Sequence, residues 1–499
     1  MARNPNELVS AIPQERRYFY LYSQQAAPIL SGPFASEFWS RLVPQTGHSS
    51  PPIRYALTSV TALIRAVENT KSSPLQNVNE NQTDSQYQFA ISQYGKAISA
   101  LRDLLSTKAK HLEVTLIACL LFACIETLLG NITGASYQII GGFKLLAEAG
   151  QRQNVKRTES HSFGVSHELT SMFTNLEVQC NLPQFFSEGP THYPLPSVLS
   201  SLARLRVPSI PASFETLPSA KICLDLILKH ILLFHYRSNP SLDRRSTTLA
   251  ELRALLDRWK QAFAPLLELA RVSSPRAAGV QMTERDDNIS ALVLASNHAM
   301  ASIIVATDSG RCSEVFYDTL TSDFQYIVDC SDLVIDIMCS PEQQQELQEQ
   351  QEQDPSRPAQ RYVFGGGLLP PLYIAASKCR HRQLRRRAIA LLRSYPIQEG
   401  IWEGYGCAQI CEWMMEIEES GIVDITTTVP GRGGREEIRN KELDSGDPGT
   451  NNNDIPEWNR VKLSASDCKL HEKVIWAQCK SALPVVQGSK AMWEKTFTW

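Results

Sequence analysis

A helical spacing of apolar side chains runs through most of this chain, and it restricts the possible folds more than any other feature. Pro51 and Pro52 suit the first turn of a helix. The apolar residues that follow recur at intervals of three and four positions: Ile53, Leu57, Val60, Ile64 and Val67. Similar stripes continue to about residue 420, and strand-like alternation is absent over that stretch. The pattern predicts an all-α fold, a large multi-helix array of packed helix pairs.

Two changes of composition divide the chain. Residues 341–360 are rich in Gln and Glu, which predicts a solvated helical extension or a disordered insertion. Residues 426–454 are rich in Gly, Asn, Asp, Glu and Arg, which predicts a disordered linker. We therefore expect one helical domain over residues 14–425 that contains the 341–360 insertion, with a short N-terminal tail over residues 1–13 before it.

The C-terminal tail over residues 455–499 has a different pattern. Two short stretches, 459–465 and 473–479, alternate between apolar and polar side chains. Such alternation is typical of strands with one buried face. The sequence predicts a β-hairpin in an otherwise helical protein.

Composition excludes several classes of protein. The 499 residues carry a net charge of -3, so no global basic field favours nucleic acid. The most apolar stretch, 112–129, contains Glu113 and Glu126 and predicts a buried core helix rather than a membrane span. The first residues lack the apolar segment of a secretory signal. The 12 cysteines are scattered, and we expect reduced thiols packed as small apolar side chains.

The motifs of enzymes and metal sites are incomplete. His167-Glu168 begins a zinc-helix motif that position 171 does not complete, and His471-Glu472 fails in the same way. Asp286-Asp287 lacks the third acid of a magnesium motif. Cys407 and Cys411 lie one helical turn apart with no second ligand pair, so we interpret them as core thiols. We assign no catalytic, cofactor-binding or metal-binding residues and expect no enzyme.

Three further clusters have simple structural interpretations. The glycines at 365–367 predict a flexible loop, since no strand signal precedes them and no Lys, Ser or Thr follows them as a phosphate loop requires. His230 and His235 lie in an apolar helix and are interpreted as core or edge histidines. Glu416, Glu418 and Glu419 are expected on a solvated helix face.

A basic cluster invites a comparison with DNA-binding surfaces. Its members are Lys378, Arg380, Arg382, Arg385, Arg386, Arg387 and Arg393. On a helix that begins near Gln383, the buried stripe would be Leu384, Ala388, Leu391 and Leu392. Contact with DNA phosphates is one interpretation. The favoured one is a solvated face with local carboxylate partners such as Glu399.

Five segments together resemble the regulatory domain of fungal zinc-cluster transcription factors, which carry a binuclear zinc, six-cysteine DNA-binding module. They begin "ERRYFYLYSQQAAPILSG", "SQYGKAISALRDLL", "EVTLIACLLFACIETLLG", "LTSMFTNLEVQC" and "LPPLYIAASKCRHRQLRRRAIALLRSYPIQEG". Their order and approximate spacing are similar to those of the family over residues 14–420. The resemblance implies a helical regulatory domain in the nucleus that controls transcription, often of metabolic or secondary-metabolite genes.

The chain departs from the family at the DNA-binding module. Thirteen residues precede Gln14, none of them Cys, and no other region has six closely spaced cysteines. Without the module, we expect no direct sequence-specific DNA binding by this chain. Either an upstream exon encodes the module, or the protein acts through a protein partner such as another transcription factor. The alternative function is a helical scaffold for protein–protein interaction. A small-molecule effector is a further expected partner, since large helical domains leave apolar pockets between layers.

Overall fold

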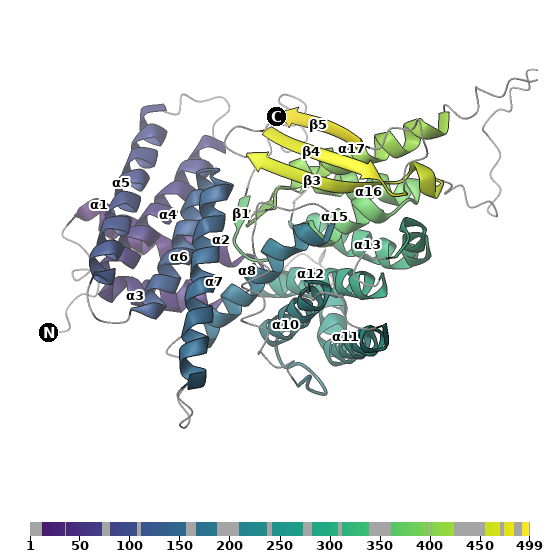
Figure 1. Cartoon of the computed structure of the whole chain (residues 1–499). Helices are drawn as coiled ribbons and strands as arrows, with labels where there is room; N and C mark the ends of the chain where they lie inside the picture. The colour runs from purple at the N-terminus through teal and green to yellow at the C-terminus, as the bar shows by residue number, and fades with distance from the viewer. Residues whose placement is uncertain are drawn as a thin grey trace, which may run out of the picture.

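The computed structural model consists mainly of packed helices, which confirms the predicted all-α class (Figure 1). The structure describes residues 12–34, 36–71, 80–106, 111–155, 166–186, 209–236, 242–272, 282–307, 312–338, 361–395, 397–400, 402–423, 455–469, 474–483 and 492–498. The predicted tail over 1–13 lies outside these residues except for its last two positions. The predicted insertion (341–360) and linker (426–454) lie wholly outside them.

The N-terminal lobe contains the elements before residue 156, drawn purple to blue in Figure 1. Its elements are α1 (Pro13–Leu21), the π-helical turn η2 (Tyr22–Ala26), α2 (Ala27–Ser31), the π-helical turn η3 (Phe38–Leu42), α3 (Val43–Ser49), α4 (Pro51–Lys71), α5 (Glu80–Leu105), α6 (Leu112–Leu128) and α7 (Ile132–Val155). Helix α6 is buried on nearly all sides, as its apolar composition predicts. It packs against α4 and α7.

Helix α8 (His167–Phe186) belongs to both halves of the molecule. An apolar stripe of Leu169, Phe173, Leu176 and Cys180 is buried in the core of the N-terminal lobe. Leu182, on another face of the same helix, packs into the core that follows. Because both faces are covered, α8 is buried at almost every position from residue 173 to 182.

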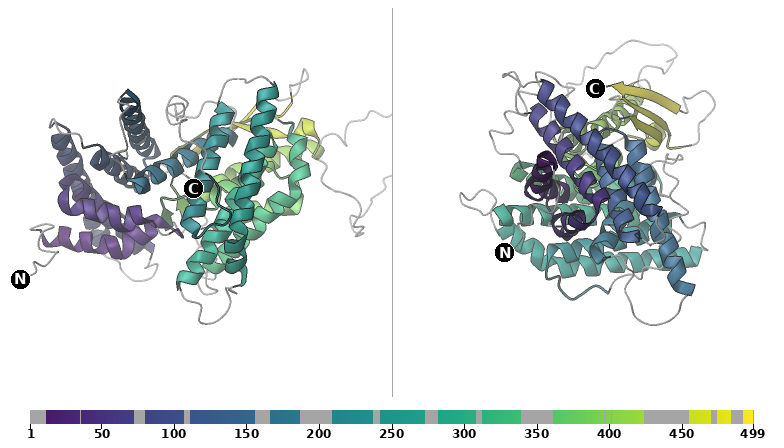
Figure 2. Two further views of the ribbon diagram at one scale, coloured as in Figure 1. Left: turned by 90° about the horizontal axis from the view of Figure 1, so that it is seen from below. Right: turned by 90° about the vertical axis from the view of Figure 1, so that its left-hand side faces the viewer.

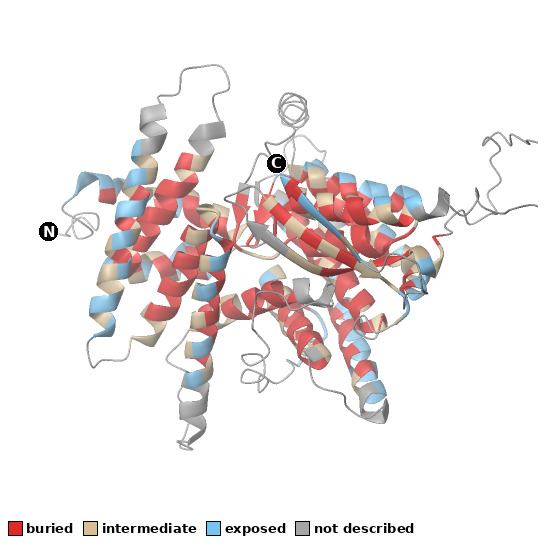
Figure 3. Ribbon diagram, turned by 45° about the horizontal axis from the view of Figure 1, so that its top comes forward, coloured by how far each residue is buried: buried red, intermediate tan, exposed pale blue. Residues whose placement is uncertain are grey.

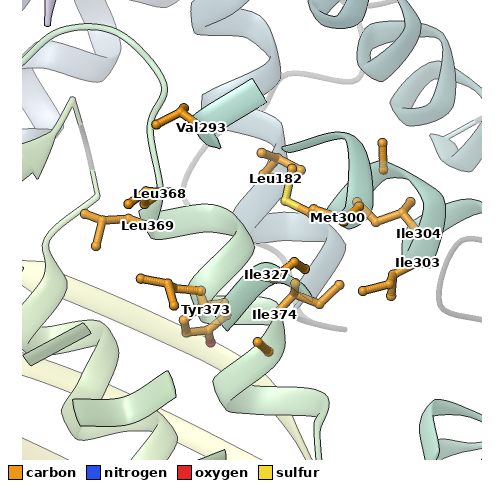
Figure 4. Packing of buried hydrophobic residues seen from close by; sticks show 14 of the residues in the cluster. Leu182, Val293, Met300, Ile303, Ile304, Ile327, Leu368, Leu369, Tyr373 and Ile374 are labelled. Atoms are coloured by element: carbon orange, nitrogen blue, oxygen red, sulfur yellow. The ribbon is translucent and has the colours of Figure 1, made fainter. Parts of the chain in front are cut away.

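The C-terminal lobe is organised around one apolar helix. Its helices are α10 (Leu217–Tyr236), α11 (Leu242–Val272), α12 (Met282–Ala306), the 3-10 turn η4 (Glu314–Leu320), α13 (Thr321–Met338), α15 (Leu369–Lys378), α16 (Arg382–Ser394), α17 (Gly404–Val423) and the 3-10 turn η5 (Glu457–Asn459). Helix α12 packs against α10, α11, α13 and α15. Figure 4 shows Met300 and Ile303 of α12 within this core.

Among the described residues, the segment Asp286–Ala306 of α12 is long and apolar enough to cross a membrane, with a mean hydropathy of 1.7. Most of this segment is buried inside the lobe. Packing on four sides explains its apolar composition, because a helix surrounded by other helices has no polar face. Most other described helices have a buried face toward the core and an exposed face toward solvent (Figure 3).

The C-terminal residues form an antiparallel three-stranded sheet in the order β3–β4–β5. Its strands are β3 (Val461–Lys469), β4 (Val474–Ser481) and β5 (Met492–Thr498). The predicted hairpin is confirmed by the β3–β4 pairing, which runs from Val461 opposite Ser481 to Lys469 opposite Val474. The third strand was not predicted. Alternate residues of β4 are buried, and β3 and β4 both pack against α17 (Figure 1).

A short parallel ladder at the boundary between the lobes was also not predicted. Strand β1 (Arg361–Val363) pairs with β2 (Ile397–Glu399). Three residues are too few for a periodicity signal, so the sequence pattern could not indicate them. Next to β1 the chain turns at Gly32, whose φ of 62° suits glycine, and an added Cβ there would lie 2.3 Å from a Val363 methyl group. Figure 2 shows the two lobes side by side in the view from below.

Candidate functional site

Three of the seven members of the basic cluster are internal, so the expectation of a solvated face was wrong for them. Lys378, Arg380 and Arg385 are all buried, and Arg380 and Arg385 are among the largest fully buried side chains of the protein. The predicted apolar stripe of α16 is confirmed, since Leu384, Ala388, Leu391 and Leu392 are all buried. Arg385 lies on the same side of the helix as this stripe.

Two buried carboxylates neutralise these cations. Glu418 of α17 accepts hydrogen bonds from Arg380 Nη2 at 2.7 Å and from Arg385 Nη1 at 2.5 Å. Glu314 accepts one from Lys378 Nζ at 2.8 Å. Burial raises the pKa of Glu314, but Lys378 and Arg380 outweigh it and lower that pKa to about 2. Glu418 was expected on a solvated face, and its complete burial corrects that prediction.

The buried ion network also fastens the C-terminal sheet to the helices. Glu418 accepts a hydrogen bond from the backbone N–H of Val461, the first residue of β3, at 2.9 Å. Arg460, the residue before β3, donates to the Glu314 carbonyl at 2.6 Å and pairs with Asp318 at 2.5 Å. The network therefore has a structural role that joins α15, α16, α17, η4 and β3.

Three of the more exposed members of the cluster are matched with acids on neighbouring helices, whereas Arg382 is exposed and makes no ion pair within the described residues. Arg386 pairs with Glu419 at 2.6 Å, and Arg393 pairs with Glu412 at 2.5 Å. Arg387 pairs with Asp329 and Asp332. These carboxylates occupy the positions that DNA phosphates would take, so the geometry does not favour a phosphate-binding surface here.

The glycine loop at 365–367 enters helix α15 in a way that the sequence did not predict. Strand β1 precedes it, contrary to the expectation that no strand would. The Glu399 carboxylate accepts from the N–H groups of Leu368 and Leu369 at 2.8 and 3.1 Å. The first turn of the helix, where a phosphate group would bind, is therefore occupied by a carboxylate of the protein itself. Glu399 was expected to pair with the basic cluster, and this position corrects that expectation.

The carboxyl group of Glu399 is buried and titrates near neutral pH. Burial raises its pKa to about 7, although the N–H groups of Leu368 and Leu369 act in the opposite direction. Gly367 makes this contact possible, because a Cβ at that position would lie 2.0 Å from Glu399 Oε1. Any side chain at position 367 would displace the carboxylate.

Glu399 lies beside a cavity of about 430 Å³ between the lobes, which we call the seam cavity. Its apolar walls come from both lobes and include Ile29, Ile64, Leu128, Ile289, Val293 and Ile397. Figure 4 shows Val293 close to Leu368 at the start of α15. The two lobes also touch at the edge of the cavity, where Ser290 Oγ donates to the Pro33 carbonyl at 2.5 Å.

Two acidic residues are among the described residues that line the seam cavity: Glu399, which is buried, and Asp286, which is exposed. The volume is within the range of about 300–1,000 Å³ that is usual for small-molecule pockets. The cavity is the best candidate for a functional site because it combines an apolar volume with a perturbed carboxyl group.

A second hollow of about 630 Å³ lies on the other side of the glycine loop, and Gly365 lines both. The residues His167 and Glu168 line it, and Glu168 pairs with Arg41 at 3.1 Å. Glu37 lines the same hollow, and Arg41 pairs with its carboxylate as well at 2.8 Å.

The remaining residues singled out in the sequence do not meet in one place. Cys407 and Cys411 both lie on α17, and Cys411 is buried. Within the described ranges, no group of three or more potential ligands could hold a metal ion. His230 contacts the Leu226 carbonyl one turn earlier at 2.9 Å. His471 and Glu472 lie outside the described part of the chain.

Comparison with known proteins gives no relative. No protein-family model, curated protein or solved structure matches the chain. The function must therefore be argued from the residues and their geometry.

Proposed function

We propose that this chain is a transcriptional regulator of the fungal zinc-cluster factor type that lacks its own DNA-binding module. It works in the nucleus, reaches DNA through a protein partner, and controls metabolic or secondary-metabolite genes. Its helical lobes form the regulatory part, and the seam cavity is the place where a small effector acts.

One observation carries the proposal. Three of the segments that resemble the family are far apart in the sequence, yet each contributes to the seam cavity. The first supplies Pro28 and Ile29, the third supplies Leu128, and the fifth supplies Tyr395 and Glu399. A regulatory domain needs a site whose occupancy can alter how its parts pack, and a cavity between two lobes has that property.

The charge pairing on α16 supports the partner-mediated part of the proposal. Six of the seven cations that could have contacted DNA, all except the exposed Arg382, are buried with Glu314 and Glu418 or paired with other acids. A partner that carries its own basic module would supply the contacts to phosphates.

A reporter experiment tests this function. The full chain is fused to a bacterial repressor DNA-binding domain in a fungal host, with the binding domain alone as control. We expect the fusion to change reporter output several-fold and a fluorescently tagged chain to lie in the nucleus. In parallel, deletion of the gene should alter a defined set of transcripts.

An unchanged reporter, unchanged transcripts and cytoplasmic residence under all growth conditions would overturn the proposal. That result would favour the alternative, a helical scaffold for protein–protein interaction without a role in transcription, because grooves between helix pairs bind peptides readily.

A further inference from the structure

We propose that the seam cavity binds one small uncharged apolar molecule. The regulatory meaning of such binding rests on the proposed function, whereas the ligand class follows from the walls of the cavity. The size of the cavity, its apolar surface and the state of its acidic groups each limit the ligand.

The walls present apolar side chains from five helices. Ile29 of α2, Ile64 of α4 and Leu128 of α6 belong to the N-terminal lobe, and Val293 of α12 and Met338 of α13 belong to the C-terminal lobe. Water beside such side chains finds few hydrogen-bond partners, so an apolar ligand that replaces it is favoured. A cavity of about 150 Å³ is enough to hold benzene. The seam cavity, at about 430 Å³, has room for a larger ring system.

The acidic groups of the walls are already engaged within the protein. The Glu399 carboxyl accepts from the N–H groups of Leu368 and Leu369, and the hydroxyl of Tyr395 also donates to it. Asp286, in the exposed first part of α12, takes part in another interaction of its own. Neither acid therefore offers an open charge that would select a cationic ligand.

A charged ligand would lose its hydration on entering the cavity. Burial of an ion costs far more free energy than burial of an apolar group unless the ion is paired. An ammonium group would find both Glu399 and Asp286 engaged, and a carboxylate would lie near the Glu399 carboxyl. The walls should therefore favour an uncharged molecule over an amine or an acid of the same size.

The ligand would lie against both lobes at their boundary. Val363 of β1 and Ile397 of β2 also line the cavity, and these two strands pair with each other. At the edge of the cavity the lobes touch through Ser290 and Pro33. A bound molecule would cover apolar surface of both lobes at once, so it should stabilise their packing.

Photolabelling of the purified full chain tests the site. Benzophenone serves as the probe, because it is uncharged and apolar and bonds covalently to nearby C–H groups under ultraviolet light. Mass spectrometry then locates the adducts. We expect Met338 to be labelled, since it lines the cavity and methionine reacts readily with this probe. Adducts confined to residues outside the cavity walls, or no adduct at all, would overturn the site.

Competition against the probe tests the ligand class. The competitors share one skeleton and differ in the head group: 4-phenylbutan-1-ol, 4-phenylbutylamine and 4-phenylbutyrate. At neutral pH the alcohol is uncharged, the amine is a cation and the acid is an anion. We expect the alcohol to protect Met338 at a concentration at least about ten-fold lower than either ion. Equal or stronger protection by either ion would overturn the proposed class.

Two variants connect the labelling to the cavity. Val67→Trp puts a large side chain into the space from a half-buried position near the end of α4, and should abolish the adduct at Met338. Val114→Trp is the matched control, because Val114 is also half-buried in the N-terminal lobe but does not line the cavity. Undiminished labelling of folded Val67→Trp would show that the probe binds elsewhere. If that variant does not fold, the adduct map and the competition with the native chain still decide.

Failure of the inference and failure of the proposed function can be told apart. If the uncharged competitor protects Met338 as expected but the reporter fusion is silent, the site stands and the proposed function falls. If the reporter responds but Met338 is not labelled, the inference falls and the proposed function stands.

Discussion

Replacement of Glu418 by Gln should release the C-terminal sheet from the helical body. The substitution keeps the size of the side chain but removes the charge that Arg380 and Arg385 share. It also weakens the acceptor for the Val461 N–H at the start of β3. Both arginines are at most 1% exposed, so water cannot replace the lost carboxylate without local opening.

The size of the effect follows from the burial. Removal of one member of a buried ion pair costs about 3–5 kcal/mol, because the other member stays buried without its partner. The whole free energy of unfolding of a domain is typically about 5–15 kcal/mol. The loss should be concentrated in β3 and β4, since these strands are attached to α17 at Glu418.

Hydrogen exchange measured by mass spectrometry can localise the loss. Every 1.4 kcal/mol is a factor of ten, so amides in residues 461–481 should exchange faster by roughly two to four orders of magnitude. Amides in α6, which lies in the other lobe, should change little. Glu419→Gln is the matched control, because Glu419 pairs with the half-exposed Arg386 and its loss should cost at most about 1 kcal/mol.

The pH dependence gives a second test of the same reasoning. Burial raises the pKa of Glu418, but Arg380 and Arg385 outweigh it and hold that pKa below its usual 4.5. A lowered folded-state pKa contributes stability above the unfolded value and loses it as the pH falls through the folded value. Protection of the sheet should therefore persist down to about pH 4.5 and fall below it. Equal exchange in the Glu418 and Glu419 variants would refute the argument.

Three other substitutions are expected to have measurable effects on urea unfolding. Gly367→Ala should cost about 1–3 kcal/mol, since its Cβ would displace the Glu399 carboxylate from two N–H groups; an unchanged midpoint would contradict this. The free energy of unfolding of the native chain should fall by about 3 kcal/mol as the pH rises from 4.5 through about 7, because a raised carboxyl pKa means that the folded state favours the protonated form of Glu399. Glu399→Gln should remove this pH dependence, and parallel pH curves of the two proteins would argue against the reasoning. Lys229→Met should cost about 3–5 kcal/mol by leaving its buried 2.6 Å partner Glu177 unpaired, and the double variant with Glu177→Leu should recover much of it; no recovery would count against a simple ion pair.

Helix α17 shows how much of the site the sequence could have indicated. Cys411, Met414 and Glu418 recur at the helical intervals of three and four positions, and all three are buried. This spacing places Glu418 on the buried face, but its charge was interpreted as a sign of exposure. A single acid on an apolar stripe is therefore a usable signal of a buried ion pair.

Glu399 offered no comparable signal. It ends a strand of three residues, and its partners, Leu368 and Leu369, lie 31 and 30 positions earlier in the sequence. The seam cavity is equally invisible, since residues near 29, 64, 128, 289 and 397 meet there only after folding. The expectation that a large helical domain leaves apolar pockets between its layers could not place one in the sequence.

The sequence by itself determined the helical class and the hairpin, because both are recorded in the spacing of apolar residues along a few turns or one strand pair. It also determined which side of α16 carries the apolar stripe. Only the tertiary structure decided which charges are buried. The electrostatic environment of a side chain depends on charged and polar groups from remote segments. Arg460 and Glu314, for example, are in contact but lie 146 positions apart in the sequence. Local periodicity holds no record of such neighbours, so the ion network and the seam cavity appear only when the chain packs together.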